Sequence, residues 1–432
     1  MTSSILRSVL ALGVFGSVGV ASAATGAAAD SYEALKGFSC AQDGAAQAWQ
    51  PMAGSRAVSV ATVEGRIAFR MPCNFRGTNI ERASWDHPIV QDLAMCQGVQ
   101  FMLHCADLSP VASFVLYLHS GDGWYRGAFD VPAAGRWTRI RIAKADMQVE
   151  GHPAGWTKID TVRLSAWRGK DQDTQFHVTD FGLFGTDTKI VIVRGDSAAE
   201  RAPGELGAVR EYTGVMADLL ERANLPYLVL SDVDVTAARL RATELVILPH
   251  NPAMPDEVAR EIAAFHKGGG ALLACYHLPD ALEPLVGIEV GRHIREPYDG
   301  YFASIRPGDE PLEGMPPVTQ QASWNVHEAR AVGPDAHVAA WWYTKEGRST
   351  ETPAIVVGER CVYLSHVLRP DDPANKLQLL LAMAGHLVPS LWSDAARGCL
   401  DRVGRFGPYP VSYTHLRAHE TSLHLVCRLL LE

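Results

Sequence analysis

The first half of the chain consists of short runs in which apolar and polar residues alternate, separated by turns rich in glycine, proline and aspartate. Clear examples are residues 98–103, 113–118, 137–142, 159–164 and 176–181. Alternation places every second side chain on the same face, which is typical of half-buried antiparallel strands. Several such strands at short spacing predict an all-β sandwich or jelly roll over residues 31–186.

The pattern changes near residue 187, where wholly apolar runs begin to alternate with helical patterns. Strands are predicted at 189–193, 227–230, 245–248, 271–275, 338–343, 354–357 and 361–365, and helices at 206–224, 257–267 and 372–387. Buried strands that alternate with helices over short links favour a parallel sheet covered on both faces. We therefore predict a second, α/β domain over residues 187–392.

The N-terminus has the features of an export signal. Arg7 precedes an apolar run over 9–20, and Ala21-Ser22-Ala23 forms a small-x-small cleavage site. The run is shorter than the roughly 20 residues that cross a bilayer, so we favour a signal peptide over residues 1–24 to a membrane anchor. The mature protein is expected to be secreted or periplasmic, with no membrane contact.

Composition limits which partners and cofactors we expect. The net charge of -9 and the absence of a basic stripe argue against nucleic acid. Of the eight cysteines, Cys40, Cys73, Cys96 and Cys105 could form disulfides in an oxidising compartment or remain buried thiols. The chain has no Cys/His spacing suited to zinc and no GxGxxG, so we predict no metal and no cofactor.

Three aromatic segments carry a family resemblance in the first domain. Gly123-Trp124-Tyr125, Gly135-Arg136-Trp137 and Gly155-Trp156 resemble the galactose-binding-like carbohydrate-binding modules. The resemblance implies that aromatic rings stack on sugar rings. The candidates are the pair Trp124 and Tyr125, expected to be exposed, and then Trp85, Trp167 and Arg168. The alternative is that these side chains belong to the core and that the domain only packs against a neighbour.

The second domain resembles the class I glutamine amidotransferase-like, flavodoxin-like fold, through residues 245–252, 268–276 and 363–368. It is closer to the version found in β-galactosidase trimerisation domains and in front of family-10-like bacterial glycosyl hydrolases. With a sandwich before it, the chain resembles the N-terminal region of such a secreted hydrolase. The resemblance implies a glycan partner, homo-oligomerisation, or packing against a catalytic barrel.

In the amidotransferases, a nucleophilic cysteine on a sharp turn works with a histidine from a later strand. Cys275 and His366 stand at the matching places. The flanks of Cys275 are Leu273 and His277 where the pattern has glycines, and Val367 and Leu368 follow His366 where a carboxylate is needed. Two interpretations remain, a Cys/His hydrolase or amidase and a non-catalytic fold with a buried Cys275.

Open α/β sheets bind ligands at the carboxyl ends of their strands. The residues expected at that edge, besides His366, are His250, Asn251, Tyr276 and His277. Together they form a polar, uncharged rim suited to a small neutral ligand.

The C-terminal residues differ in character from the rest of the chain. Residues 411–432 resemble the translated sequencing-adapter tail that recurs at the ends of metagenome-assembled genes. Residues 393–410 would then be a linker or the start of a missing catalytic barrel, which needs about 250 residues. The sequence therefore predicts a truncated, non-catalytic accessory region that binds glycan or assists assembly. The alternatives are the Cys/His hydrolase and a purely structural oligomerisation module.

Overall fold

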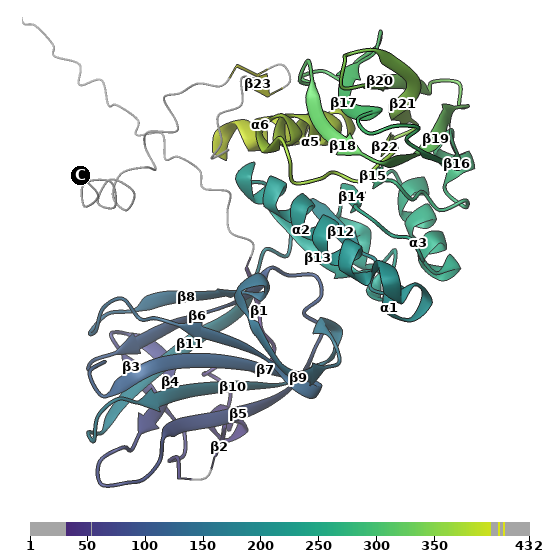
Figure 1. Ribbon diagram of the computed structural model, residues 1–432. Helices are drawn as coiled ribbons and strands as arrows, with labels where there is room; N and C mark the ends of the chain where they lie inside the picture. The colour runs from purple at the N-terminus through teal and green to yellow at the C-terminus, as the bar shows by residue number, and fades with distance from the viewer. Residues whose placement is uncertain (1–31, 53, 399–404, 407–408, 411–432) are drawn as a thin grey trace, which may run out of the picture. The chain divides into compact units, whose positions relative to one another are not determined.

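The computed structural model describes residues 32–52, 54–398, 405–406 and 409–410 (Figure 1). The predicted signal peptide over 1–24 and the tail over 411–432 lie outside these residues. Within the described part of the chain, no helix combines the length and apolar character needed to cross a membrane.

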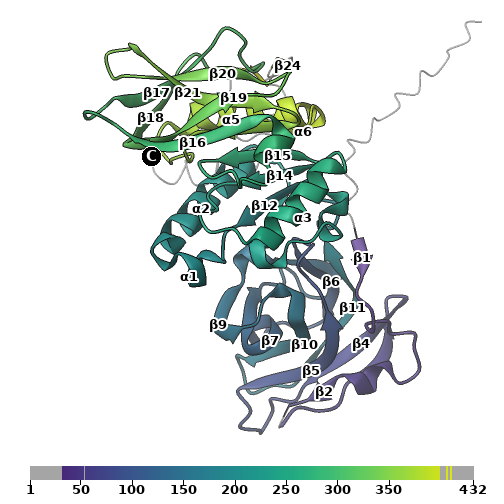
Figure 2. The same ribbon diagram turned by 90° about the vertical axis from the view of Figure 1, so that its right-hand side faces the viewer.

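The N-terminal part is a β-sandwich of two antiparallel sheets (Figures 1 and 2). One sheet has the order β3-β4-β11-β6-β8, with β1 paired to β11, and the other has the order β2-β5-β10-β7-β9. The first sheet contains β1 (Tyr32–Ala34), β3 (Ser59–Val63), β4 (Arg66–Cys73), β6 (Gly98–Cys105), β8 (Thr138–Ala143) and β11 (Thr174–Phe184). The second contains β2 (Gln50–Pro51), β5 (Arg82–Gln91), β7 (Val111–Phe129), β9 (Gln148–Pro153) and β10 (Ile159–Arg168).

A single apolar core lies between these two sheets. Leu103 and Phe176 from the first sheet and Leu116 and Leu164 from the second are all buried in it. Phe176 also meets Trp85 of the second sheet edge to face, with ring centroids 5.9 Å apart. The alternation along the strands thus fills one core from two faces, and the prediction of a sandwich is confirmed.

The C-terminal part is built on a nine-stranded sheet of order β13-β12-β14-β15-β22-β21-β20-β17-β18. Its first five strands pair in parallel, and the remainder pair antiparallel. The parallel strands are β12 (Ile190–Arg194), β13 (Tyr227–Ser231), β14 (Leu245–Leu248), β15 (Ala271–Cys275) and β22 (Cys361–Leu364). The antiparallel strands are β17 (Phe302–Pro307), β18 (Thr319–Ser323), β20 (His337–Tyr343) and β21 (Ser349–Gly358).

Helices cover both faces of the parallel strands. Ile192 packs in the core that holds α2 (Leu206–Arg222) and α5 (Pro373–Leu387), whereas the neighbouring Val193 packs in the core that holds α3 (Asp256–Lys267). The shorter helices are α1 (Ala198–Arg201), α4 (Glu283–Val286) and α6 (Ser390–Gly398). The three long helices lie where the helical patterns predicted them.

The all-parallel sheet that the sequence suggested is wrong beyond β22. β20 and β21 were expected as strands, but they extend the sheet antiparallel, and β17 and β18 complete this extension. A separate antiparallel pair, β16 (Ile288–Arg295) and β19 (Asn325–Ala331), was not predicted at all. Its position matters because it carries two histidines to the carboxyl edge of the parallel strands.

The cysteines of the described residues are free thiols. Cys40, Cys73, Cys96, Cys105, Cys275 and Cys361 are all buried and unpaired with one another. Of the two alternatives that the sequence left open for the first four, the structure has buried thiols.

Candidate functional site

Histidines from five segments gather around Tyr276 at the carboxyl edge of the parallel strands. Tyr276 and His277 follow β15, while the others follow β14 and β22 or lie on β16 and β19. The Tyr276 ring centroid lies 4.5 to 6.3 Å from the ring centroids of these histidines. We call the group the histidine cluster; its members are His250, His277, His293, His327 and His366.

The backbone of Tyr276 is held in an uncommon conformation. Its φ is 63°, in the left-handed region that costs a side chain with a Cβ about 1 kcal/mol or more. Two contacts hold it there, a hydrogen bond from its N–H to the Leu364 carbonyl (2.8 Å) and one from the Tyr363 hydroxyl to its own carbonyl (2.7 Å). Its hydroxyl donates to Asn325 Oδ1 at 2.9 Å. Hydrogen bonds thus hold both the backbone and the side chain of this strained residue. Strained residues held in this way are typical of functional sites.

Three of the imidazoles have one nitrogen occupied by an acceptor. His250 Nε2 lies 3.1 Å from Glu205 Oε2, so this nitrogen carries the proton that the carboxylate accepts. His327 Nδ1 lies 3.2 Å from the Gly291 carbonyl, and His366 Nδ1 lies 3.1 Å from the Val367 carbonyl and 3.3 Å from Gln321 Nε2. Each neutral ring therefore keeps a lone pair on its other nitrogen.

Burial disfavours the charged form of four of these histidines. It lowers the pKa of His277 to about 3 and that of His366 to about 4, and it also lowers the pKa of His250 and His327. Burial raises the pKa of the Tyr276 hydroxyl to about 12. At neutral pH these four imidazoles are thus neutral and can accept a hydrogen bond, and the phenol is a donor.

Trp324 forms an exposed aromatic surface beside the cluster. It lies between β18 and β19, is 47% exposed, and its ring centroid is 5.8 Å from that of His366. The Arg369 guanidinium lies over the Trp324 ring at 5.3 Å. An exposed indole beside polar groups can serve as a platform for the apolar face of a ligand.

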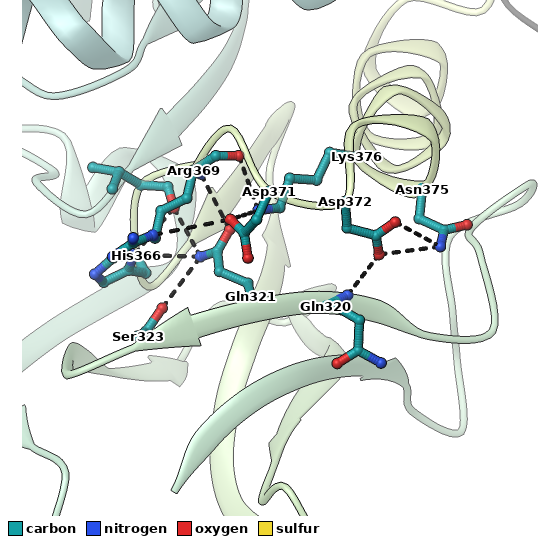
Figure 3. A network of polar contacts seen from close by, with 10 residues as sticks. Gln320, Gln321, Ser323, His366, Arg369, Asp371, Asp372, Asn375 and Lys376 are labelled. Carbon is teal, nitrogen blue, oxygen red and sulfur yellow. Dashed lines mark hydrogen bonds and ion pairs between the residues drawn. The ribbon is translucent and has the colours of Figure 1, made fainter. Parts of the chain in front are cut away.

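A polar network orders the loop that carries His366 and Arg369 (Figure 3). Gln321 Nε2 donates to the Val367 carbonyl at 2.9 Å, and the Arg369 N–H donates to Gln321 Oε1 at 3.3 Å. Lys376 is 1% exposed and donates to the Arg369 carbonyl at 2.9 Å and to Asp371 Oδ1 at 2.6 Å. The loop is therefore tied to β18 on one side and to α5 on the other.

The predicted nucleophile Cys275 is enclosed. It is 0% exposed, and burial raises the pKa of its thiol to about 12. It pairs with Leu364 of β22, and its neighbour Ala274 pairs with Leu248 of β14, so its side chain belongs to the core rather than to the turn, which begins one residue later. Burial thus disfavours the thiolate that nucleophilic catalysis requires, which fits the alternative of a non-catalytic fold with a buried Cys275.

The rim residues predicted from topology gather at the carboxyl edge of the parallel strands. Asn251 differs from the others because its side chain is hydrogen-bonded within the sheet. His250, Tyr276, His277 and His366 contact one another within the cluster. Asn251 is 3% exposed and its Nδ2 donates to the Val193 carbonyl at 3.1 Å, so it links the ends of β12 and β14.

Two of the aromatic residues proposed for the sandwich are buried. Trp85 is 0% exposed, and its Nε1 donates to the Arg56 carbonyl at 2.7 Å. Tyr125 is 7% exposed and stacks on Trp156 with centroids 3.7 Å apart. The exposed pair expected at Trp124 and Tyr125 is therefore wrong for Tyr125, because these residues lie inside the long strand β7 and alternate between its faces.

Trp124, Trp167 and Arg168 remain partly exposed. Trp124 lies between the Arg163 guanidinium, 4.3 Å from its centroid, and the His119 ring, at 4.4 Å. Arg163 is itself fixed by Asp86 through hydrogen bonds of 2.6 and 2.8 Å. On this sheet face Trp124 therefore lies against a cation and an imidazole rather than standing free.

A cavity of about 630 Å³ lies at the opposite, amino edge of the parallel strands. Its polar lining includes Arg241, Glu244 and Arg360. None of the residues that line this cavity belongs to the histidine cluster, so we place the candidate functional site at the carboxyl edge.

Comparison with known proteins gives structural neighbours only. No protein-family model matches the chain, and no curated protein matches it either. A ThuA-like protein from Bacteroides uniformis ATCC 8492 matches with 11% identity and a TM-score of 0.36, over 47% of this chain and 91% of that chain. The family 11 carbohydrate-binding module of a Clostridium thermocellum cellulosomal cellulase matches with 12% identity and a TM-score of 0.28, over 36% and 95%.

A third neighbour is a larger enzyme. The α-L-fucosidase isoenzyme 2 from Paenibacillus thiaminolyticus matches with 15% identity and a TM-score of 0.32, and the match covers 46% of this chain and 33% of that chain. The structural neighbours are thus carbohydrate-binding modules and glycosidases, together with a ThuA-like protein.

Proposed function

We propose that this protein binds a neutral carbohydrate at the carboxyl edge of the parallel strands, where the histidine cluster, Tyr276 and Trp324 lie. The observation that carries the proposal is the pairing of uncharged acceptor nitrogens with an exposed indole. Sugar hydroxyls donate hydrogen bonds to such nitrogens, and the C–H face of a pyranose stacks on an aromatic ring. The imidazoles and the indole both lie at the carboxyl edge of the parallel strands, and the Trp324 ring contacts the His366 ring.

The charges near the histidine cluster favour a neutral ligand over an anionic one. The Glu205 carboxylate is engaged with His250, and Arg369 faces the Trp324 ring. The lowered pKa values of His277 and His366 leave these two imidazoles without the charge that would bind a carboxylate or sulfate at neutral pH.

The wider proposal is an accessory, non-catalytic part of a secreted glycoside hydrolase-like protein. The α/β region would be its flavodoxin-like, amidotransferase-like domain over 187–392, and the sandwich over 31–186 its carbohydrate-binding-like domain. The parallel strands flanked by helices support the first assignment. The burial of Cys275 speaks against the Cys/His hydrolase or amidase.

Calorimetric titration with a panel of neutral oligosaccharides and matched uronic-acid oligosaccharides tests this proposal. We expect a neutral member to bind and Trp324→Ala to weaken it about tenfold, the loss of one stacking contact. Tyr298→Ala is the matched control, because Tyr298 is a similarly exposed aromatic (44%) outside the cluster. A blank panel, or equal losses in both variants, would leave the purely structural role as the better interpretation.

The partly exposed Trp124 on the sandwich defines a second candidate surface. Its contact with Arg163 and the pairing of Arg163 with Asp86 place charged and aromatic groups together. Trp124→Ala in the same titrations measures what this surface contributes.

A further inference from the structure

We propose that the cavity at the amino edge of the parallel strands binds a monocarboxylic acid with an apolar body, and that Arg241 binds its carboxylate. The cavity measures about 630 Å³, within the range of roughly 300–1,000 Å³ that is typical of small-molecule sites. It shares no lining residue with the histidine cluster at the opposite edge. The inference therefore goes beyond the proposed carbohydrate site and does not depend on whether a carbohydrate binds there.

The cavity is formed by the ends of several elements. A short 3-10 helix, η6 (Arg239–Ala242), and the residues after it lead into β14, while residues 268–270 lead into β15 and Arg360 leads into β22. These three strands are neighbours in the sheet, so their amino ends lie together. The last residues of α3 and the residues around the end of α5 complete the lining.

Much of the lining is apolar. The larger apolar side chains in it are Leu240, Phe265, Leu387 and Val388. Gly270 sets the position of one of them, because a Cβ there would lie 2.1 Å from Phe265 Cζ. The glycine thus lets the Phe265 ring lie against the backbone that leads into β15. Covering such a surface with a hydrocarbon group is favourable, so the ligand is expected to have an apolar body.

Arg241 supplies a positive charge that no neighbour compensates. Glu244 also lines the cavity, but its carboxylate lies 3.5 Å from Lys189 Nζ. The guanidinium of Arg360 donates to the His266 carbonyl at 2.9 Å. Arg241, by contrast, has neither a hydrogen bond nor an ion pair with any residue that the structure describes. Since a guanidinium can donate two parallel hydrogen bonds to a carboxylate, this free cation favours an acid.

A second lining residue has an unused polar group. Thr243 is 7% exposed, and its Oγ1 makes no hydrogen bond within the described part of the chain. A buried hydroxyl without a partner costs free energy, which a ligand recovers when it supplies an acceptor. A carboxylate oxygen is such an acceptor.

The remaining lining groups favour a single negative charge over a phosphate or sulfate. The C-terminal ends of α3 and α5 carry partial negative charge, and Glu244 adds a carboxylate. The N–H groups of Gly268, Gly269 and Gly270 already donate to carbonyls at the end of α3. The glycine loop therefore offers no N–H groups to a phosphate. A monocarboxylic acid with a hydrocarbon chain fits both the charge and the apolar lining.

The test is a ligand-observed NMR titration of the full chain with octanoate, octanol and octylamine, which share one hydrocarbon chain and differ in the head group. We expect octanoate to bind with a dissociation constant of about 1 mM or below, and octanol and octylamine to bind at least about fivefold more weakly. Arg241→Gln should lower the affinity for octanoate to that for octanol, because it removes the charge. Arg260→Gln, which changes an exposed arginine of α3 outside the cavity, is the matched control and should leave binding unchanged.

Ala264→Phe tests the cavity itself. Ala264 is exposed on α3 and lines the cavity, so a phenyl ring there occupies the space of the ligand without entering the core. This variant should bind octanoate at least about fivefold more weakly than the unaltered chain. Circular dichroism confirms that each variant is folded.

The inference is overturned if octanoate does not bind, if octanol or octylamine binds as tightly, or if Arg241→Gln or Ala264→Phe keeps the octanoate affinity of the unaltered chain. Trp324→Ala separates this test from that of the proposed function. It is expected to weaken carbohydrate binding and to leave octanoate binding intact, so failure of one proposal does not conceal failure of the other. A loss of octanoate binding in Trp324→Ala would place the acid at the carboxyl edge and would also overturn the inference.

Discussion

The hydroxyl of Tyr363 donates a 2.7 Å hydrogen bond to the carbonyl oxygen of Tyr276. Tyr363 is a core residue of β22, whereas Tyr276 is the first residue after β15 and has a left-handed backbone. The bond thus joins the buried sheet to the centre of the histidine cluster. It gives a physical reason why a tyrosine, with its Cβ, stays in a backbone conformation that glycine prefers.

Tyr363→Phe should lower the free energy of unfolding by about 1–2 kcal/mol, because it leaves a carbonyl near the core without its donor. Urea denaturation measures the change. Tyr298→Phe is the control, since Tyr298 is 44% exposed and water replaces its lost contact; its effect should stay below about 0.5 kcal/mol. Equal effects of the two changes would show that the Tyr363 hydroxyl does not restrain the turn.

Cys275→Ala should not alter carbohydrate binding, and the native thiol should be inert. Burial raises the pKa of Cys275 to about 12, so reactive thiolate is nearly absent at neutral pH. Reaction with Ellman's reagent measures how many thiols of the protein are reactive. The unaltered chain and Cys275→Ala should release the same amount of chromophore when native and differ by one equivalent in denaturant. A difference before unfolding would restore Cys275 as a candidate nucleophile.

His366 should make the stability of the protein depend on pH in the acid range. Its folded-state pKa is about 4, lowered by burial from its ordinary value of 6.5. Between these values the unfolded chain binds a proton that the folded chain does not. The contribution of His366 is therefore complete above about pH 6.5 and falls as the pH falls toward about 4, by roughly 1 kcal/mol per pH unit.

His366→Gln removes this titration while keeping a side chain that can donate to the Val367 carbonyl. The variant should show a flatter dependence of the free energy of unfolding on pH between about 4.5 and about 6.5. Urea denaturation at several pH values compares it with the unaltered chain and with His152→Ala, whose histidine is exposed. An unchanged slope in His366→Gln would mean that His366 is not neutralised by burial.

The sequence located most of the rim but only part of the cluster. His250, Tyr276, His277 and His366 follow strands whose apolar runs are unmistakable, so topology alone placed them. His293, His327 and Trp324 lie on or beside β16, β18 and β19, whose sequences are mainly polar. β18, for example, reads TQQAS and alternates buried and exposed residues over only five positions. Such strands form because of their neighbours rather than through a hydrophobic pattern of their own.

The sandwich aromatics were misplaced for a different reason. Glycines beside Trp124 and Tyr125 are as typical of a turn as of a strand, yet Gly121 and Gly123 both lie within the 19-residue strand β7. A Cβ on Gly123 would come within 2.4 Å of the Pro153 backbone nitrogen, so this glycine permits the close approach of β9. The strand continues through it, and its alternation turns Tyr125 toward the core. Nothing in the local sequence distinguishes these two uses of glycine.

Lys376→Met should affect both stability and carbohydrate binding, because Lys376 ties the loop of His366 and Arg369 to α5. The ammonium group is 1% exposed and donates to the Arg369 carbonyl and to Asp371. Methionine fills the space but makes neither bond. We expect a loss of about 1–3 kcal/mol in the free energy of unfolding, since the partners lie near the surface and can rehydrate.

The effect on binding follows from the position of Arg369 over Trp324. Without the Lys376 bonds, the loop that carries Arg369 and His366 is no longer fixed. Arg369 then no longer packs against the Trp324 indole, and His366 loses its fixed orientation. Affinity for the carbohydrate should therefore fall about threefold to tenfold. Calorimetric titration measures this, with Lys267→Met at the exposed end of α3 as the matched control. If Lys376→Met loses stability but binds as tightly as the control, the network serves the fold alone. If it keeps stability and loses affinity, the loop acts on the site without supporting the core.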